Sequence, residues 1–423
     1  MARPIQKIAE KLIPYEILIV GIAVAAGFIS TRALPSAPIA AIIFFLLRAF
    51  AHQRLSVRTP VDWPVVGLVL MILVTLWVTA FPELTRPQVY RLLSGIALYY
   101  ALVNWVITPA RLRWVARGAA AGGFLLAAFA TISVEWATNK VTFVPDVFYR
   151  SFRVLVGDPV HPNVIAGSLV ILLPVALAVL LFAGKQLHWL ERVLTGLAIV
   201  GMAAILVLTL SRGAWLTTGV ALAILVTLRW RYGWLGSILV AAAGGGLIYL
   251  VGAQQVLMFL LSTSTLPDGG SRLEFWARAL HMIQDFPFTG IGMGSFTPVA
   301  DLLYPFYNAA AHSLSHAHNL FLQIAVDLGL PGLIAWLAIF ITMVALSWRL
   351  VRLGKTSGDG WLAGLGAGLL CSQVALAVHG MFDAVTWGMV RPAPIVWALW
   401  GMIAASWGIY SRLYAAPANQ LDQ

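Results

Sequence analysis

Charged residues are scarce in this chain. Only 10% of its 423 residues are Asp, Glu, Lys or Arg, whereas 61% are hydrophobic, and the mean hydropathy is +0.89. So little charge cannot cover a water-soluble globule, and the composition therefore predicts a polytopic membrane protein. The 27 Lys and Arg outnumber the 16 Asp and Glu, but cations scattered over short loops are typical of membrane topology. We therefore predict no nucleic-acid partner.

Cysteine and nucleotide-binding motifs are equally scarce. Cys371 is the single cysteine and lies in an apolar run, so the chain has neither a disulfide framework nor a thiolate metal site. The glycine-rich segment 290–294 lacks the Gly-Lys-Ser/Thr ending of a phosphate-binding loop and has no strand-turn-helix context. It predicts a compact turn instead.

Long apolar runs dominate the sequence. A helix needs roughly 20 apolar residues to cross the hydrocarbon core, and about twelve runs approach this length. Basic residues precede the first run, which resembles a signal anchor. No internal repeat or low-complexity linker divides the chain, so we predict one all-α membrane domain over residues 1–423. The runs lie near residues 14–31, 36–50, 63–80, 90–107, 114–134, 164–183, 190–210, 214–229, 233–252, 319–348, 361–386 and 392–411.

The distribution of Lys and Arg predicts the orientation. With a cytoplasmic N-terminus and about twelve spans, most cations fall on the cytoplasmic side, as the positive-inside rule requires, and both termini lie there. The two long hydrophilic stretches, residues 135–163 and 253–318, then lie outside. The arginines that remain outside cluster in these stretches and at residues 211–215, which indicates an anionic partner.

Two outer segments contain candidate anion ligands. Arg212 lies in a turn between two strongly apolar helices, where Gly213 permits close ligand approach, and we favour phosphate binding over contact with lipid headgroups. The segment before residue 164 supports substrate contact and a basic interfacial collar equally well. Its candidate residues are Arg150, Arg153, His161 and Asn163.

An amphipathic helix of about four turns is predicted from Ser271, because Glu274 follows at capping-box spacing. Arg272 would occupy its first turn, where backbone N–H groups already favour an anion. Arg278 has carboxylates at helical spacing and ranks lower as a ligand. The predicted apolar face contains Leu273, Trp276, Leu280 and Ile283.

The next segment contains His312, His316 and His318, followed by Asn319. A neutral imidazole can take a proton from a hydroxyl near neutral pH, and Asn319 could orient a polar group. Structural histidines and a zinc site are the alternatives; zinc is weakened because no acidic residue lies at a familiar ligand spacing. We therefore predict general-base chemistry and no metal.

His379 and Asp383 lie four residues apart, with Arg391 shortly beyond. They are candidates for a proton path in a transporter, a structural histidine-carboxylate pair, or part of the same catalytic cavity.

The chain resembles the bacterial O-antigen ligase and polymerase family, the WaaL/Wzy-like membrane glycosyltransferases. The resemblance covers roughly residues 160–340 and rests on the order and spacing of HPNVIAGSLVILLP, SRGAWL, RLEFWARALHMIQDFPFTGIGMGSF and HAHNLFLQIAVDLGLPGL.

This resemblance implies a GT-C-like fold of about twelve helices in the bacterial inner membrane, with a large periplasmic loop. It also implies a metal-independent reaction, without a cofactor, that uses an undecaprenyl-diphosphate-linked glycan. Arg212 and Arg272 would hold the donor diphosphate, and His318 would be catalytic. The acceptor would be lipid A-core for a ligase, a second lipid-linked glycan for a polymerase, or protein for a related protein glycosyltransferase. We favour the ligase; a lipid-glycan transporter is the alternative of another class.

Overall fold

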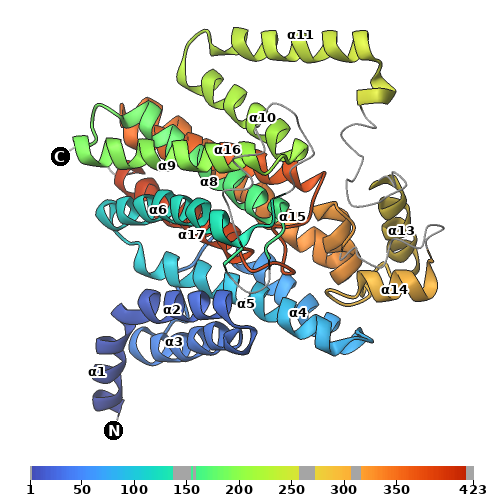
Figure 1. The fold of residues 1–423 in the computed structure, drawn as a ribbon. Helices are drawn as coiled ribbons and strands as arrows, with labels where there is room; N and C mark the ends of the chain where they lie inside the picture. The colour runs from blue at the N-terminus through green and yellow to red at the C-terminus, as the bar shows by residue number, and fades with distance from the viewer. Residues whose placement is uncertain (1, 137–153, 156–158, 257–271, 306–315, 416–423) are drawn as a thin grey trace.

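The protein is built from helices, as a computed structural model shows (Figure 1). The structure describes residues 2–136, 154–155, 159–256, 272–305 and 316–415. Within these ranges the chain forms no strand beyond an isolated parallel bridge between Val134 and Val160. The longer helices are α1 (Ala2–Leu12), α2 (Glu16–Ile29), α3 (Ser36–His52), α4 (Asp62–Val78), α5 (Pro82–Trp105), α6 (Pro109–Ser133), α8 (Pro162–Ala183), α9 (Trp189–Leu208), α10 (Arg212–Arg229), α11 (Gly233–Val251), α13 (Arg272–Asp285), α14 (Phe296–Leu303), α15 (Leu320–Thr356), α16 (Gly360–Gly380) and α17 (Pro394–Ala415).

Each of the apolar runs predicted from the sequence coincides with one of these helices. Among the described residues, eight helical segments are long and apolar enough to cross a membrane. The shorter α4 is also apolar, whereas α5, α10 and α17 do not meet the same criteria of length and hydropathy. A multi-pass membrane protein follows from these segments, and the count of about twelve spans stays a prediction.

Side-chain caps explain several helix starts. Thr108 accepts a hydrogen bond from the N–H of Arg111 at 3.3 Å, and Asp359 accepts one from Leu362 at 3.0 Å. His161 caps α8 through Nδ1, which accepts from the N–H of Asn163 at 3.2 Å. Prolines follow two of these caps as the first residue of the helix. The backbone N–H that proline lacks would have no acceptor within the helix at this position.

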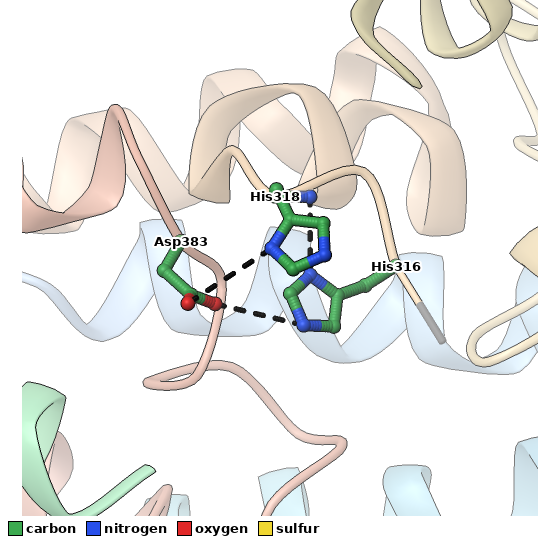
Figure 2. Close-up of side chains that lie close together, drawn as sticks. All are labelled: His316, His318 and Asp383. Atoms are coloured by element: carbon green, nitrogen blue, oxygen red, sulfur yellow. Dashed lines mark hydrogen bonds and ion pairs between the residues drawn. The ribbon is translucent and has the colours of Figure 1, made fainter. Parts of the chain in front are cut away.

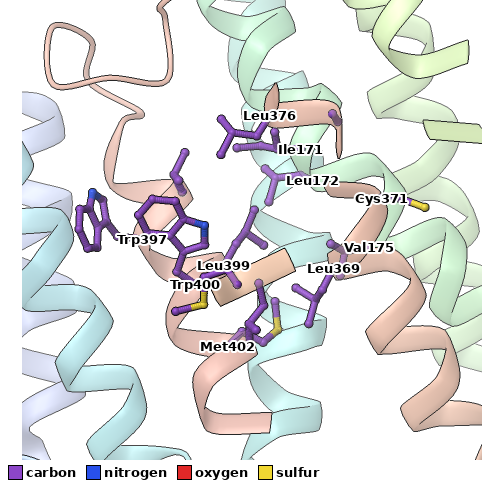
Figure 3. Close-up of a cluster of buried hydrophobic side chains, with 14 of the residues drawn as sticks. Ile171, Leu172, Val175, Leu369, Cys371, Leu376, Trp397, Leu399, Trp400 and Met402 are labelled. Atoms are coloured by element: carbon purple, nitrogen blue, oxygen red, sulfur yellow. The ribbon is translucent and has the colours of Figure 1, made fainter. Parts of the chain in front are cut away.

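The core is centred on α8 and α16, which are the most buried apolar helices (Figure 3). Glycine allows them to approach: a Cβ at Gly368 would lie 2.7 Å from the Cα of Val175. Trp397 and Trp400 of α17 pack edge to face beside this layer, with ring centroids 4.8 Å apart. This rigid centre holds the start of α8 and the end of α16 side by side.

A kink divides α15 near its start. Gly329 has a φ of 71°, which interrupts the helical backbone, and Pro331 follows. The N–H of Leu330 donates instead to the carbonyl of Pro287 at 2.7 Å, so the segment after α13 docks against the kink. Three glycines with positive φ, Gly290, Gly292 and Gly294, form the docked turn. The compact turn predicted for this segment is confirmed.

Asp327 of α15 forms a hydrogen bond that holds the glycine turn at residues 290–294 against this helix. This buried carboxylate accepts from the indole N–H of Trp387 and from the amide of Gln323, both at 2.8 Å, and from the N–H of Gly294 at 3.3 Å. A buried carboxylate needs such donors because desolvation otherwise disfavours it.

The amphipathic helix α13 is present as predicted, and its predicted apolar face is confirmed in part. Trp276 and Ile283 pack against the buried cluster, whereas Leu273 and Leu280 are 46% and 49% exposed. The buried residues of the helix are Phe275, Ala279 and Met282. These pack with α14 and with Ala317. The helix has two apolar stripes. The small Ala279 allows the stripe of Phe275, Ala279 and Met282 to pack closely against its neighbours.

Candidate active site

His316 and His318 are presented by the turn that begins α15. Asn319 caps the helix, since its Oδ1 accepts from the N–H groups of Phe321 and Leu322 at 3.0 and 3.1 Å. His318 has a φ of 50°, a left-handed conformation that is uncommon for a residue other than glycine. The side-chain oxygen of Asn319 is therefore engaged in capping, while its Nδ2 lies 3.4 Å from the carbonyl of Met381.

His316 and Asp383 form the first contact of the site (Figure 2). The Nδ1 of His316 accepts from the backbone N–H of His318 at 3.1 Å, so Nε2 carries the proton of the neutral ring. That Nε2 lies 3.5 Å from Oδ1 of Asp383. The two groups thus face each other with a donor toward an acceptor.

His318 lies beside the same carboxylate with both nitrogens uncommitted. Its Nδ1 is 3.9 Å from Oδ2 of Asp383, and its ring packs at a centroid distance of 5.7 Å from Phe275. Within the described part of the chain, neither ring nitrogen has a hydrogen-bond partner, although both are buried. A buried polar group without a partner is costly and is often kept for chemistry.

Asp383 is positioned from two helices. Asn163, in the first turn of α8, donates from Nδ2 to Oδ2 at 3.0 Å, and the N–H of Ala384 donates to Oδ1 at 2.8 Å. The backbone N–H of Asp383 also donates to the carbonyl of His379 at 3.0 Å. Asp383 therefore lies at the junction of α8, α16 and the turn before α15.

Electrostatics keep the histidines neutral and the carboxylate charged. Burial, followed by the neighbouring His316, lowers the pKa of His318 to about 3; Asp383 opposes this decrease and Arg272 adds to it. Burial likewise lowers the pKa of His316. Burial alone would raise the pKa of Asp383, but the surrounding histidines and Arg272 outweigh it and lower this pKa to about 2.

The predicted arginine ligands differ in their surroundings. Arg272 begins α13 and feels both the attraction of Asp383 and the repulsion of Arg212, which begins α10. Two helix starts, each with an arginine, thus converge near the cluster. Arg278 lies 3.8 Å from Glu274 in an i,i+4 ion pair, so its charge is partly matched within the helix.

A metal could be held at this place by His316, His318 and Asp383. One ligand atom from each lies within 4.8 Å of the others, a spacing that suits a small divalent cation. The sequence argument against zinc was that no acidic residue lies near the histidines along the chain at a spacing typical of zinc ligands. The structure supplies such a residue from a distant segment, because Asp383 lies beside both histidines. The adjacent positive charge of Arg272 opposes a cation.

Two other predicted histidines are described by the structure, whereas several predicted residues lie outside the described ranges. His379 is buried in the last turn of α16 beside α8, where its Cε1 would lie 3.0 Å from a Cβ on Gly167. His161 is exposed and begins α8. The predicted contacts Arg150 and Arg153, with Ser271 and His312, lie outside the described residues.

Residues 197–337 match the O-antigen ligase family (Wzy_C). This match covers about one third of the 423 residues and supports the resemblance of the chain to the O-antigen ligase/Wzy-like family. The matched segment includes Arg212, Arg272 and the two histidines of the cluster, whereas Asn163 and Asp383 lie outside it. No curated protein matches the chain. The family resemblance predicted from the motifs is confirmed. The family consists of glycosyltransferase-like enzymes of the ligase and polymerase type.

Three features of the site were not predicted from the sequence. Phe275, against the ring of His318, was not among the residues of the predicted apolar face of α13. Asp327 was overlooked although an acid inside an apolar helix is a recognisable signal. The contact of Asp383 with both His316 and His318 has no local signal, because about 65 residues separate the partners.

Proposed function

We propose that this protein is an inverting membrane glycosyltransferase that moves a glycan from undecaprenyl diphosphate to an acceptor hydroxyl. The specific reaction proposed is O-antigen ligation onto lipid A-core. The observation that carries the proposal is His318, a neutral imidazole with uncommitted nitrogens, next to an ionised Asp383 and a pair of arginines. General-base catalysis and leaving-group stabilisation require these groups.

His318 serves as the base in this mechanism. Its Nδ1 faces Asp383, so the proton of the neutral ring resides there and the lone pair of Nε2 is available. Asp383 stabilises the imidazolium that forms when Nε2 takes the acceptor proton. Asn163 and Ala384 hold the carboxylate in place through their donors, so they position Asp383 without touching substrate.

Each bond change then has a place. The acceptor O–H transfers its proton to Nε2 of His318 while its oxygen attacks the anomeric carbon. The bond from that carbon to the diphosphate oxygen breaks on the opposite face, which inverts the configuration. The electron pair leaves with the lipid diphosphate, whose charge Arg212 and Arg272 stabilise, and Arg278 lies one helical turn beyond Glu274 as a weaker contributor.

Donor binding also prepares the base. A pKa of about 3 makes His318 a weak acceptor of protons, and Arg272 is one cause of that low value. A bound diphosphate would neutralise Arg272 and add negative charge nearby, which raises the pKa of His318 toward the working range. The base then becomes effective only when the donor is in place.

The orientation is proposed as a bacterial inner-membrane protein with both termini in the cytoplasm. Helix α1 lies on the left in Figure 1, at the side opposite α13 and α14 on the right. Arginines stack on aromatic rings at that side, as Arg113 does on Trp361 at 5.2 Å and Arg229 on Phe182 at 5.5 Å. The arginines favour the cytoplasmic side by the positive-inside rule, whereas aromatic rings are common at both interfaces. Residues 135–163 and 253–318, and the active site, then belong to the periplasmic side.

The deciding experiment supplies purified protein in liposomes with undecaprenyl-diphosphate-linked glycan and lipid A-core. Glycan on lipid A-core supports ligation, whereas longer glycan on the polyprenyl carrier supports the polymerase. Donor binding without any transfer supports the lipid-glycan transporter.

His318→Ala tests the base in the same assay. We expect turnover to fall by about 10²–10⁴-fold while donor binding persists. His281→Ala, which alters an exposed histidine of α13, is the matched control. Unchanged turnover in His318→Ala contradicts the assignment.

A further inference from the structure

A basic cavity lies beside the active site. Its volume is about 240 Å³, and it is lined by the ends of α2, α6 and α8, by Arg91 of α5 and by the segment before α17. Arg91, Arg391 and His161 form its polar lining. Phe28 and Phe129 form an aromatic wall, with ring centroids 6.4 Å apart.

The two arginines line the same cavity, and among the described residues no carboxylate lines it with them. Arg91 donates from one terminal nitrogen to the carbonyl of Met389 at 3.1 Å, and its buried Nε has no hydrogen-bond partner within the described ranges. The charge of Arg391 disfavours the charge of Arg91, and among the described residues no acid offsets this repulsion. Two like charges kept together in a partly buried cavity indicate an anion that binds between them.

The apolar lining restricts the kind of anion. Besides the phenylalanines, the buried Leu126 and Ile165 contribute to the walls. Such walls exclude water and strengthen the attraction of the arginines for an anion. A phosphate attached to a sugar or lipid can occupy both the charged part and the apolar part of the cavity. Free phosphate occupies only the charged part.

The cavity shares a wall with the catalytic cluster. His161 lines it and is close enough to lower the pKa of His318. Two residues further along the chain, Asn163 donates to Asp383. The arginine pair of the cavity consists of residues other than the donor pair, since Arg91 belongs to α5 and Arg391 to the segment before α17, whereas Arg212 and Arg272 begin α10 and α13. An anion here would therefore be held by groups other than the donor arginines.

We infer that the cavity between Arg91 and Arg391 is an acceptor subsite that binds a phosphate group of the acceptor glycolipid. This inference rests on the proposed glycosyltransferase function. The subsite orients the acceptor so that its hydroxyl reaches His318, while the donor diphosphate lies on Arg212 and Arg272. No covalent step takes place in the subsite.

The test is direct binding, which needs neither donor nor turnover. Purified full-length protein is titrated with phosphorylated lipid A-core and with the same glycolipid after removal of its phosphates. The expected result is that wild type binds the phosphorylated form about tenfold tighter or more, as charge-assisted hydrogen bonds provide. Arg391→Gln should remove most of this preference.

Arg91→Gln can disturb folding because Arg91 also holds the Met389 carbonyl, so Arg91→Lys serves as the second variant and should keep part of the preference. The control is Arg86→Gln, an exposed arginine of the same helix, which should retain all of it. Melting temperatures verify that the variants are folded.

Equal binding of both acceptors, or a preference that survives Arg391→Gln, overturns the inference. Displacement of the acceptor by phosphatidylglycerol vesicles but not by phosphatidylcholine vesicles overturns it in favour of a phospholipid headgroup. Displacement by millimolar inorganic phosphate alone favours free phosphate and overturns it as well. Phosphate-dependent binding without any glycan transfer upholds the subsite while the proposed function fails.

Discussion

Acid should destabilise this protein through His318. The pKa of this imidazole is lowered to about 3 in the folded protein, chiefly by burial. In the unfolded chain it returns to about 6.5. The unfolded state therefore binds a proton first as the pH falls, and folding loses stability from pH 6.5 downward until the folded pKa is reached.

The size of the effect follows from the shift. At pH 5, which is about 1.5 units below the pKa of the unfolded imidazole, the unfolded side chain is protonated while the folded one is still neutral. This difference lowers the free energy of unfolding by about 2 kcal/mol. The side chain is only 13% exposed, so solvent screens little of this difference.

The assay compares melting temperatures at pH 7.5 and pH 5.0 in detergent. His318→Gln keeps a polar side chain but does not titrate, so its melting temperature should fall less than that of wild type. His52→Gln, at an exposed position of α3, should behave as wild type. Equal decreases in wild type and His318→Gln would refute a buried, neutral His318.

Three further predictions concern the same region. Asp383→Asn should lower turnover by about 10²-fold, because the imidazolium of His318 loses its counter-charge; single-turnover kinetics with bound donor would measure this, and an unchanged rate would contradict it. Treatment with a metal chelator should leave turnover intact, and loss of activity restored by zinc would transfer the role of His316, His318 and Asp383 to metal binding. Gly294→Ala should destabilise by about 1–3 kcal/mol, since Gly294 has a φ of 79° and its new Cβ would meet Gln88, whereas Gly244→Ala points into open space and should be neutral in the same thermal scan.

The helices could be predicted because their signals are local. An apolar run long enough for a helix requires only neighbouring residues, and every predicted run is helical in the structure. The turn after α13 was predicted for the same reason, since its glycines alternate at positions 290, 292 and 294. Arg272 and Arg212 could be singled out because arginines on the outer side of a membrane protein contradict the topological bias.

Several site contacts could not be predicted, because they join segments that only packing brings together. The choice between two apolar faces of α13 depended on the shapes of α14 and α15, and this choice put Phe275 against His318. Sequence spacing says nothing about which of several partners a carboxylate will meet across a bundle.

The sequence by itself determined a membrane-embedded helical chain, its resemblance to the O-antigen ligase family, and the side-chain types available for a base and for anion binding. Only the tertiary structure decided that Asp383 contacts His316 and His318, and that Arg91 lies near Arg391 about 300 residues away. The physical reason is the distance along the chain over which each interaction acts. Hydropathy and helix capping act within a few residues, whereas the pKa values and anion sites depend on burial and on charges that the packing of α5, α8, α15 and α16 brings within a few ångströms.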